Sequence, residues 1–288
     1  MTHSYLASPS RTIDVLRRHG LYTRKRLGQH LLIDDNVVGR IIDLAGLRAD
    51  DVVLEVGPGI GTLTVALTRA AGTVLALEAD ERLLPVVIES VGGSEGLHVL
   101  HADAVRVPLE RVSTPDGPPD MLVANLPYSV AATVVLRFLE GLHTLRSMTV
   151  MVQAEVADRM TADPGGKDYG SYTVKLGLHA QATGRFGVPR TCFLPPPLVD
   201  STVVRLERLD RGVSHAELRA AAMAADAAFA QRRKTVRNSL VSSLGAGRDD
   251  VEEALEGAGI EGEVRAETLS VEAFLELGRA LHRRGLVR

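Results

Sequence analysis

Cysteine is almost absent from this sequence, since its 288 residues include only Cys192. A single cysteine excludes an internal disulfide and a metal site built from several cysteines, and it fits a reducing compartment. No apolar run approaches the roughly 20 residues of a membrane-spanning helix. The first ten residues also lack the charged and apolar regions of a signal peptide. We therefore expect a cytoplasmic protein with no membrane partner and no metal.

The sequence also carries little net charge, with 33 basic and 36 acidic residues and a formal charge of −3. That total does not indicate a nucleic-acid binder. The basic residues are nevertheless unevenly placed, with one group between Arg11 and Arg26 and a second between Gln231 and Arg237, while the tail after Asp249 is mostly acidic. A nearly neutral chain can therefore present a basic face.

Strand-like and helix-like segments alternate over the first 160 residues. A capped helix is expected over 34–46, and a strand, a glycine turn, a helix and a second strand over 51–80. Further strands are expected at 97–100, 121–124 and 148–153, with a helix at 130–142. This alternation predicts an α/β fold with a parallel, doubly wound sheet.

The pattern changes after Ala162. Residues 163–172 have the composition of a loop, and strand-like runs near 173–179 and 201–207 predict an antiparallel pair that closes the sheet. From His215 onward the sequence is helical in pattern. We expect two domains: a catalytic domain over 1–210 and a small all-α domain over 211–288.

The first strand of the 51–80 unit leads into a glycine turn, Glu55-Val56-Gly57-Pro58-Gly59-Ile60-Gly61. Glycines at this point let the backbone turn tightly and approach a ligand closely. The third glycine comes one residue earlier than in a dinucleotide fingerprint, which disfavours a pyrophosphate cradle. A nicotinamide dehydrogenase stays an alternative, and nicotinamide fluorescence would reveal it.

Acidic residues follow the next two strands. Glu78 lies about 20 residues past the turn, where a carboxylate can accept hydrogen bonds from both ribose hydroxyls. Asp103 is placed to accept from the exocyclic amine of an adenine. Either acid alone could instead cap a helix. A site for ribose and adenine without a phosphate grip is most simply a site for S-adenosylmethionine.

A fourth strand ends in Asn125-Leu126-Pro127-Tyr128. An amide, a proline and an aromatic ring suit a pocket that holds a flat polar ring. The Asn125 side-chain carbonyl and the Leu126 backbone carbonyl can accept the two hydrogens of an adenine N6, with Pro127 fixing the chain so that they converge. Tyr128 can stack on the base, an interaction worth about 1–3 kcal/mol. The alternative is a polar turn in which Asn125 caps the following helix.

These motifs, with others, make the chain similar to the ribosomal RNA adenine dimethyltransferases of the KsgA (RsmA) type. The matching segments are RKRLGQHLLIDD, LEVGPGIGTLT, LEAD, HADA, ANLPYS, MVQAEVADRM, PGGKDYG, CFLPPPLVDSTVVRL and FAQRRKTVRNSL. The resemblance implies a Rossmann-like S-adenosylmethionine-dependent methyltransferase fold. It also implies transfer of up to four methyl groups to two adjacent adenosines near the 3′ end of small-subunit (16S) ribosomal RNA in a late pre-30S particle. We expect the chain to act as a monomer.

The resemblance also implies roles for single residues. His30 and Leu32 would flank the methionine part of the cofactor, and Tyr128 and Phe193 would sandwich the target adenine. The cofactor-binding set is His30, Leu32, Glu55, Gly57, Gly59, Glu78, Asp103 and Asn125. Two positions, Leu31 and Ser129, depart from the family pattern, which often has Phe and Asn there.

The second basic group, QRRKTVRNSL, places Arg232, Arg233, Lys234 and Arg237 within about two helical turns. So much charge needs phosphates or carboxylates nearby, so we expect contact with the RNA backbone or partial pairing with the protein's own acids. Lys167 and Tyr169 in the glycine loop would close over the RNA.

Two other functions stay open. One is a large-subunit adenine methyltransferase of the erythromycin-resistance type, which shares the sheet and the Asn-x-Pro-Tyr turn. The other is a ribosome-assembly factor that binds RNA and in which catalysis is secondary.

Overall fold

The computed structural model describes residues 2–21 and 30–287, and these form two compact units. The first unit comprises residues 1–157 and 182–208, and the second comprises 158–181 and 209–288. Our expected domain boundary after residue 210 placed 158–181 with the sheet, whereas these residues group with the C-terminal helices. The basic residues at positions 24–26 lie outside the described part of the chain.

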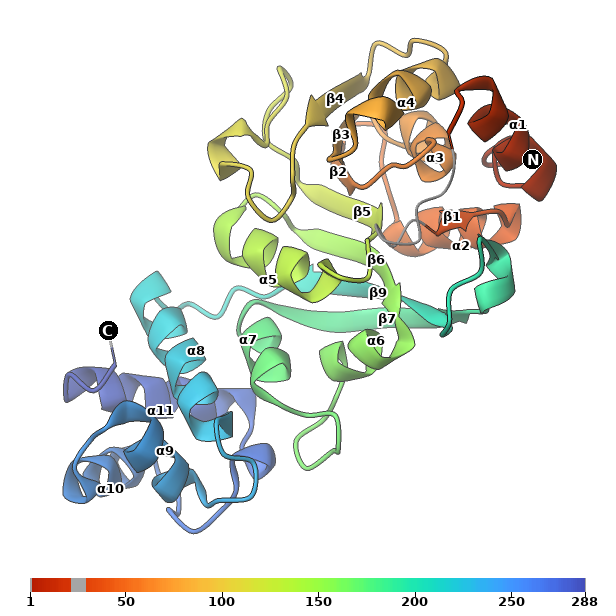
Figure 1. Cartoon of the computed structure of the whole chain (residues 1–288). Helices are drawn as coiled ribbons and strands as arrows, with labels where there is room; N and C mark the ends of the chain where they lie inside the picture. The colour runs from red at the N-terminus through yellow and green to blue at the C-terminus, as the bar shows by residue number, and fades with distance from the viewer. Residues whose placement is uncertain (1, 22–29, 288) are drawn as a thin grey trace. The chain divides into compact units, whose positions relative to one another are not determined.

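A seven-stranded sheet forms the first unit (Figure 1). Its strand order is β4-β3-β2-β5-β6-β9-β7. The strands are β2 (Val52–Val56), β3 (Thr73–Glu78), β4 (Leu97–His101), β5 (Met121–Asn125), β6 (Ser147–Gln153), β7 (Ala180–Val188) and β9 (Ser201–Arg208). Neighbours from β4 to β6 pair in parallel, and β9 is antiparallel to β6. The predicted parallel sheet with an antiparallel edge is therefore confirmed.

The strand order reverses direction between β2 and β5, because β3 and β4 continue to one side of β2 and β5 and β6 to the other. Such a switch point leaves a crevice at the carboxyl ends of the two strands, where ligands bind in open α/β sheets. Residues at the ends of β2, β3 and β5 therefore meet at one edge. A separate two-stranded sheet joins β1 (Leu31–Leu32) to β8 (Phe193–Leu194).

Helices cover both faces of the sheet (Figure 1). The helices of this unit are α1 (Pro9–Arg18), α2 (Asp35–Ala45), α3 (Thr62–Ala70), α4 (Leu84–Val91) and α5 (Ala131–Gly141), and a short helix α6 (Ala154–Met160) follows β6. Helix α2 begins where the Asp34 carboxylate accepts from two backbone N–H groups and ends at Gly46, whose φ is 59°. One core cluster joins α2 and α3 to one face of the sheet through Ile41, Leu67 and Val123, and α5 lies on the opposite face.

One predicted strand is wrong, because residues 173–179 lie in helix α7 (Ser171–His179). The alternation of Val174, Leu176 and Leu178 resembles a strand, but tertiary packing decides the outcome. The Thr173 hydroxyl accepts from the Gly170 N–H and donates to the Arg159 carbonyl, which fixes the first turn. Val174 is buried in the core of the second unit. The strand next to β9 in the sheet is β7, which the sequence did not reveal.

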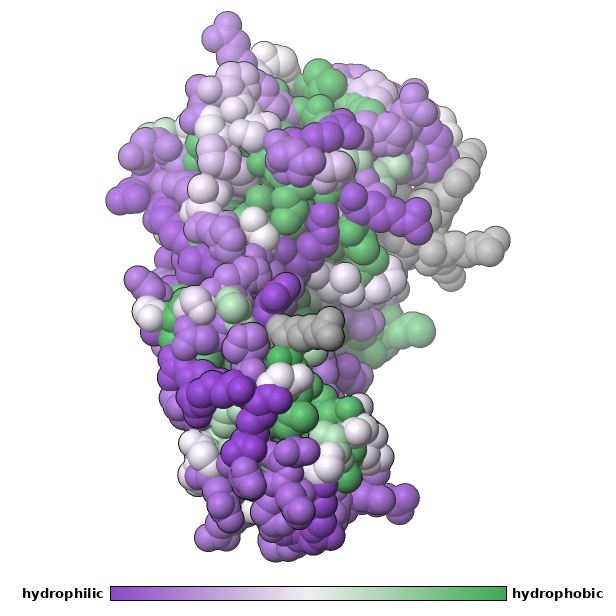
Figure 2. Space-filling view, turned by 90° about the vertical axis from the view of Figure 1, so that its left-hand side faces the viewer, coloured by the Kyte–Doolittle hydropathy of each residue, from purple (hydrophilic) through white to green (hydrophobic). Residues whose placement is uncertain are grey.

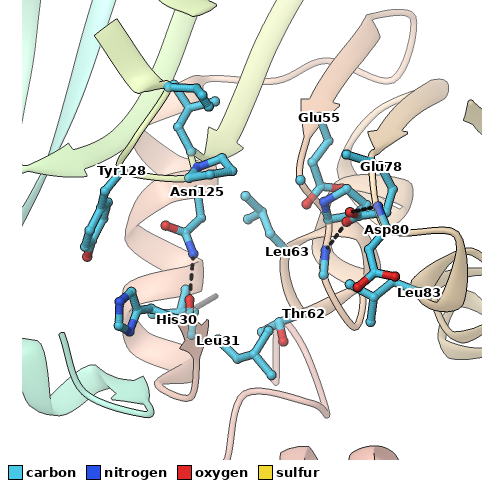
Figure 3. A pocket seen from close by; sticks show the side chains of 18 of the residues that line it. His30, Leu31, Glu55, Thr62, Leu63, Glu78, Asp80, Leu83, Asn125 and Tyr128 are labelled. Carbon is cyan, nitrogen blue, oxygen red and sulfur yellow. Dashed lines mark hydrogen bonds between the residues drawn. The ribbon is translucent and has the colours of Figure 1, made fainter. Parts of the chain in front are cut away.

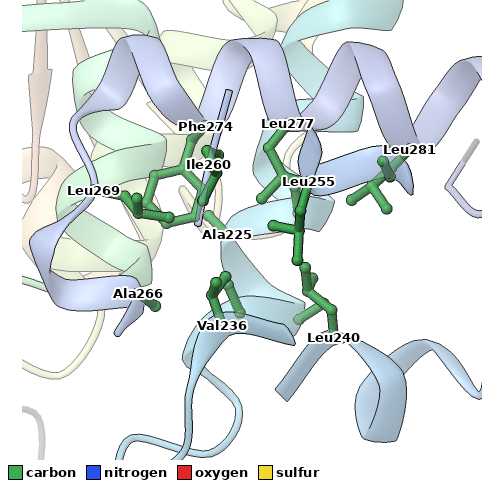
Figure 4. Close-up of a cluster of buried hydrophobic side chains, with 14 of the residues drawn as sticks. Ala225, Val236, Leu240, Leu255, Ile260, Ala266, Leu269, Phe274, Leu277 and Leu281 are labelled. Carbon is green, nitrogen blue, oxygen red and sulfur yellow. The ribbon is translucent and has the colours of Figure 1, made fainter. Parts of the chain in front are cut away.

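The second unit is a helical cluster, as the C-terminal pattern predicted (Figure 4). Besides α7 it contains α8 (His215–Phe229), α9 (Val236–Leu244), α10 (Arg248–Gly257) and α11 (Val271–Arg283). Phe274, Leu277 and Leu281 of α11 pack against Leu255 of α10 and Leu240 of α9. Helix α8 contributes alanines, which allow its backbone to approach α11 closely.

This close approach makes Gly278 intolerant of a side chain. A Cβ there would lie 2.6 Å from the Ala221 Cα, which is backbone and cannot rotate away. We predict that Gly278→Ala lowers the free energy of unfolding by about 1–3 kcal/mol, measured by urea unfolding followed by circular dichroism. Gly257→Ala is the matched control, since its Cβ would meet only Ala280 at 4.0 Å. It should leave stability unchanged or raise it by up to ~1 kcal/mol; equal losses would contradict the packing argument.

The predicted helix over the second basic group begins later than expected. Residues 230–233 form a turn, and α9 starts only after Thr235, whose hydroxyl accepts from the Asn238 N–H. The Lys234 N–H donates to the Gln231 carbonyl and closes the turn. Arg232, Arg233 and Lys234 therefore project from a turn between α8 and α9.

The face of the molecule in Figure 2 is covered mostly by hydrophilic side chains, with apolar residues in smaller groups between them. Among the residues that the structure describes, no helix combines the length and the hydropathy needed to cross a membrane.

Candidate active site

A cavity of about 600 Å³ opens at the switch point of the sheet, a volume typical of small-molecule sites. It collects the sequence-predicted residues from β1, β2, β3 and β5 and from the loops after them (Figure 3). Those that line it are His30, Leu32, Glu55, Gly57, Gly59, Glu78, Asp103, Asn125, Leu126, Pro127 and Tyr128. Phe193, the remaining catalytic candidate, does not line it.

The glycine turn forms the floor of this cavity. Gly57, Gly59 and Gly61 all have positive φ, at 69°, 60° and 89°, which side chains with a Cβ rarely adopt. A Cβ at Gly59 would lie 3.0 Å from Leu31, and one at Gly57 would lie 3.3 Å from Pro127. Glycine therefore lets the backbone approach the neighbouring residues of the cavity.

Glu78 is held in place by two backbone N–H groups. Its Oε1 accepts from the Asp80 N–H at 2.8 Å and its Oε2 from the Gly59 N–H at 3.3 Å. Burial raises the pKa of this carboxyl, while these hydrogen bonds oppose the shift. The carboxylate is thus oriented at the end of β3, where the sequence placed a ribose contact.

Asp103 is more exposed than Glu78. Its Oδ1 accepts from the Val105 N–H at 2.8 Å, and its side chain is about half exposed at 51%. It therefore caps a turn and lines the cavity at the same time.

Two buried polar groups in the cavity wall have no hydrogen-bond partner within the described part of the chain. They are Oε2 of Glu55 and the hydroxyl of Thr62, which are 2% and 5% exposed. Burial raises the pKa of Glu55 to about 8, and the charge of Glu78 adds to the shift while the nearby Thr64 hydroxyl opposes it. An unpartnered acceptor and an unpartnered donor in one wall are suited to a ligand that carries both a cation and an anion.

Asn125 stands at the end of β5 with its amide restrained. Its Nδ2 donates to the His30 carbonyl at 3.2 Å, and its oxygen points toward Tyr128 (Figure 3). The Tyr128 hydroxyl lies 2.5 Å from the Ser201 Oγ, which fixes the ring. The side chain of Asn125 therefore does not cap helix α5, the alternative that the sequence left open.

Phe193 lies elsewhere. It is 2% exposed and pairs with Leu32 across the β1–β8 sheet, within a core cluster that includes Val188 and Val203. Its expected place beside the target base is wrong for this structure, because the ring is needed to fill the core. The ring that stacks on Tyr128 belongs to His30, with centroids 5.4 Å apart and planes inclined by 26°.

Comparison with known proteins identifies the family to which this site belongs. The profile of the ribosomal RNA adenine dimethylase family matches residues 20–282. The chain belongs to this family. It is 40% identical to Ribosomal RNA small subunit methyltransferase A of Geobacillus thermodenitrificans over 97% of this chain and 98% of that protein, and 39% identical to the protein of the same name from Anoxybacillus flavithermus over 96% of each.

Solved structures agree with the fold. A dimethyladenosine transferase from Plasmodium falciparum superposes with a TM-score of 0.76 and 25% identity, covering 89% of this chain and 98% of that one. The 23S rRNA methyltransferase ErmE superposes with a TM-score of 0.67 and 28% identity, covering 88% and 99%. The resemblance to the adenine dimethyltransferases and the Rossmann-like methyltransferase fold are therefore confirmed.

The residues of this cavity suit S-adenosylmethionine, the cofactor of the family. Its amino-acid end carries an ammonium and a carboxylate, which complement the unpartnered acceptor of Glu55 and the unpartnered donor of Thr62. Glu78 presents a fixed carboxylate for the ribose. Thr62 and the apolar wall formed by Leu31, Leu63 and Leu83 have no signal in the sequence, because side chains of this kind do not differ there from ordinary core residues.

The expected RNA-binding residues lie in the second unit. The Arg232 guanidinium donates to the Lys167 carbonyl at 3.1 Å, so the glycine loop and the basic turn meet there. Arg233 and Lys234 are exposed, and the Lys167 side chain is 91% exposed. Arg232, Arg233, Lys234 and Lys167 together form the basic turn.

Two further expectations for RNA contact need correction. Arg237 is only 12% exposed and pairs with Glu252 and Glu263, which is the pairing with the protein's own acids that the sequence left open as the alternative to RNA contact. Tyr169 is 2% exposed, packs against Phe229 and donates to the Leu269 carbonyl at 2.8 Å. Both residues stabilise the helical unit.

Proposed function

We propose that this chain transfers methyl groups from S-adenosylmethionine to N6 of two adjacent adenosines near the 3′ end of small-subunit ribosomal RNA. Family membership and the cavity at the switch point support the proposal. We further propose that it acts in the cytoplasm, as a monomer, on a pre-30S particle.

The cofactor would occupy the cavity with its ribose at Glu78, its adenine near Asp103 and its amino-acid end between Glu55 and Thr62. The glycine turn at Gly57 and Gly59 would follow its outline. When bound, S-adenosylmethionine supplies an electrophilic methyl group on a positively charged sulfur.

The residues after β5 would present the nucleophile. Adenine N6 is a weak nucleophile because its lone pair is delocalised into the ring. Acceptance of its hydrogens by the Asn125 Oδ1 and the Leu126 carbonyl favours a tetrahedral nitrogen, and Pro127 fixes the backbone between them. Tyr128 holds the base flat, so that alignment rather than a strong base accelerates the transfer.

The observation that carries this mechanism is the hydrogen bond from Asn125 Nδ2 to the His30 carbonyl. A free amide could present either its nitrogen or its oxygen to the base. The His30 carbonyl accepts only from the nitrogen, so the oxygen is left to face the side of Tyr128 (Figure 3). The amide is thereby oriented as an acceptor before the base arrives.

A transfer assay with labelled S-adenosylmethionine tests the function. We expect label on small subunits that lack the modification and none on naked large-subunit RNA. Label on the large-subunit RNA alone would favour the activity named for ErmE, whose fold is similar. Binding to small subunits without any transfer would favour the assembly factor.

The basic turn gives a separate prediction about RNA affinity. Changing Arg232, Arg233 and Lys234 to alanine should weaken binding to small subunits, because fewer phosphate contacts release fewer counterions. The plot of log affinity against log salt should become shallower by about 2, measured by filter binding between roughly 50 and 200 mM salt.

The matched control changes Arg248, Arg265 and Arg283, which lie in the same unit, to alanine. It removes the same charge from other places, so it should leave the slope nearly unchanged. Equal changes in both variants would show that net charge, and not the basic turn, determines affinity.

A further inference from the structure

The ring of His30 lies against part of the surface on which the proposed mechanism places the target base. Its centroid lies 5.4 Å from that of Tyr128, with the planes 26° apart. Figure 3 shows His30 and Asn125 on the same side of Tyr128. A base that stacks on this face and bonds the Asn125 oxygen therefore needs the volume that the imidazole fills.

The backbone of His30 is anchored at its carbonyl and through the residue that follows. Its carbonyl accepts from Asn125 Nδ2 at 3.2 Å, and the next residue, Leu31, pairs with Leu194 in the β1–β8 sheet. Moving the backbone would break both contacts and release the catalytic amide.

The ring, in contrast, has a weaker anchor. Besides the stack on Tyr128, the ring makes one hydrogen bond to the residues that the structure describes, with its Nδ1 2.8 Å from the Pro195 carbonyl. A rotation about the side-chain torsions would uncover Tyr128 while the carbonyl of His30 stays on Asn125. The Tyr128 ring is held by a hydrogen bond of its own, with the Ser201 Oγ 2.5 Å from its hydroxyl.

We propose that the His30 imidazole is a placeholder for the target adenine: it occupies the base position on Tyr128 in the absence of RNA and swings aside when the base enters. This inference rests on the proposed function, because it assumes that an adenine stacks on Tyr128. His30 is then a specificity-determining residue, since an entering base must replace both a stack and a hydrogen bond. Only a base that also donates a hydrogen bond to the Asn125 oxygen compensates for the stack and the hydrogen bond that the His30 ring gives up.

The test is adenosine binding to the full chain with the cofactor site filled by S-adenosylhomocysteine, so that free adenosine can enter only the base position. His30→Ala keeps the backbone carbonyl and removes the competing ring. We expect adenosine to bind roughly tenfold more tightly to this variant, the worth of one ring contact and one hydrogen bond. Unchanged or weaker adenosine binding overturns the proposal. Weaker binding would mean that the His30 ring contacts the bound base and contributes to its affinity.

A measurement on the unaltered chain guards against a variant that folds poorly. The ring protons of His30 should show a ring-current shift from Tyr128 in the NMR spectrum, and saturating adenosine should abolish it. A shift that persists while adenosine binds overturns the proposal. His30→Phe keeps a flat ring without the bond to Pro195 and should fall between the native chain and His30→Ala in adenosine affinity.

Failure of this inference and failure of the proposed function give different results. Tyr128→Ala should abolish adenosine binding both in the native background and when combined with His30→Ala. If the native chain transfers methyl groups to small subunits but His30→Ala binds adenosine more weakly, only the placeholder role of His30 is refuted. Absence of methyl transfer by the native chain removes the proposed function itself.

Discussion

Changing Asn125 to alanine should lower methyl transfer by about 10²–10³-fold, the loss typical of removing one group that is oriented toward the reacting atom. The amide oxygen that accepts the N6 hydrogen is lost, and with it the geometry that makes the nitrogen nucleophilic. Cofactor affinity should change only a few-fold, because Glu78 and the glycine turn remain in place. Single-turnover transfer and calorimetric titration of the cofactor measure the two quantities.

Asn36→Ala is the matched control for this prediction. Asn36 is exposed in the first turn of α2, in the same compact unit, and its loss should leave transfer unchanged. Full activity in Asn125→Ala would remove the role assigned to the amide.

Cofactor binding should release up to about one proton at pH 7, because Glu55 is mostly neutral in the free protein and ionised beside a cation. Its pKa is raised from 4.5 to about 8 by burial. The positive charges of S-adenosylmethionine favour the carboxylate and lower this pKa again. Affinity should therefore rise with pH up to about 8 and then level off.

Calorimetry in two buffers with different ionisation enthalpies measures the proton release. Glu55→Gln should abolish both the release and the pH dependence of affinity, whereas the exposed control Glu95→Gln should keep them. Proton release that is unchanged in Glu55→Gln would assign the titration to another group.

The same carboxyl affects stability with a defined sign. Since the pKa of Glu55 is higher in the folded than in the unfolded chain, the folded state binds the extra proton. The free energy of unfolding should therefore fall as pH rises from about 4.5 to 8, by up to about 1.4 kcal/mol per pH unit. Glu55→Gln should remove this part of the slope.

The sequence predicted the parallel sheet and several residues that gather at its switch point, but not every element around them. Glu78 and Asn125 could be found because polar residues at the ends of buried strands are unusual and because parallel strands bring such ends together. Helix α7 was missed, since the pattern of Thr173 and Val174 does not show that α8 and α11 cover this segment. Long-range packing of this kind has no local signature.

The same limit explains the corrections to single residues. Phe193 and Tyr169 are aromatic residues in motif segments, and only the fold shows that both rings fill cores. Arg237 belongs by sequence to a basic group, but Glu252 and Glu263 neutralise it from positions 15 and 26 residues away. Residues that lie close together in a sequence motif can therefore have different places in the fold: some fill a core, one forms ion pairs, and others project from an exposed turn.

The most direct test of the central claim is to map, atom by atom, the methyl groups that this chain transfers to small subunits assembled without the modification. We predict N6,N6-dimethyladenosine at two adjacent positions near the 3′ end of the small-subunit RNA. Methyl groups on another atom of adenine, on other nucleotides, or on large-subunit RNA would contradict a site in which Asn125 and Tyr128 present adenine N6 to the cofactor.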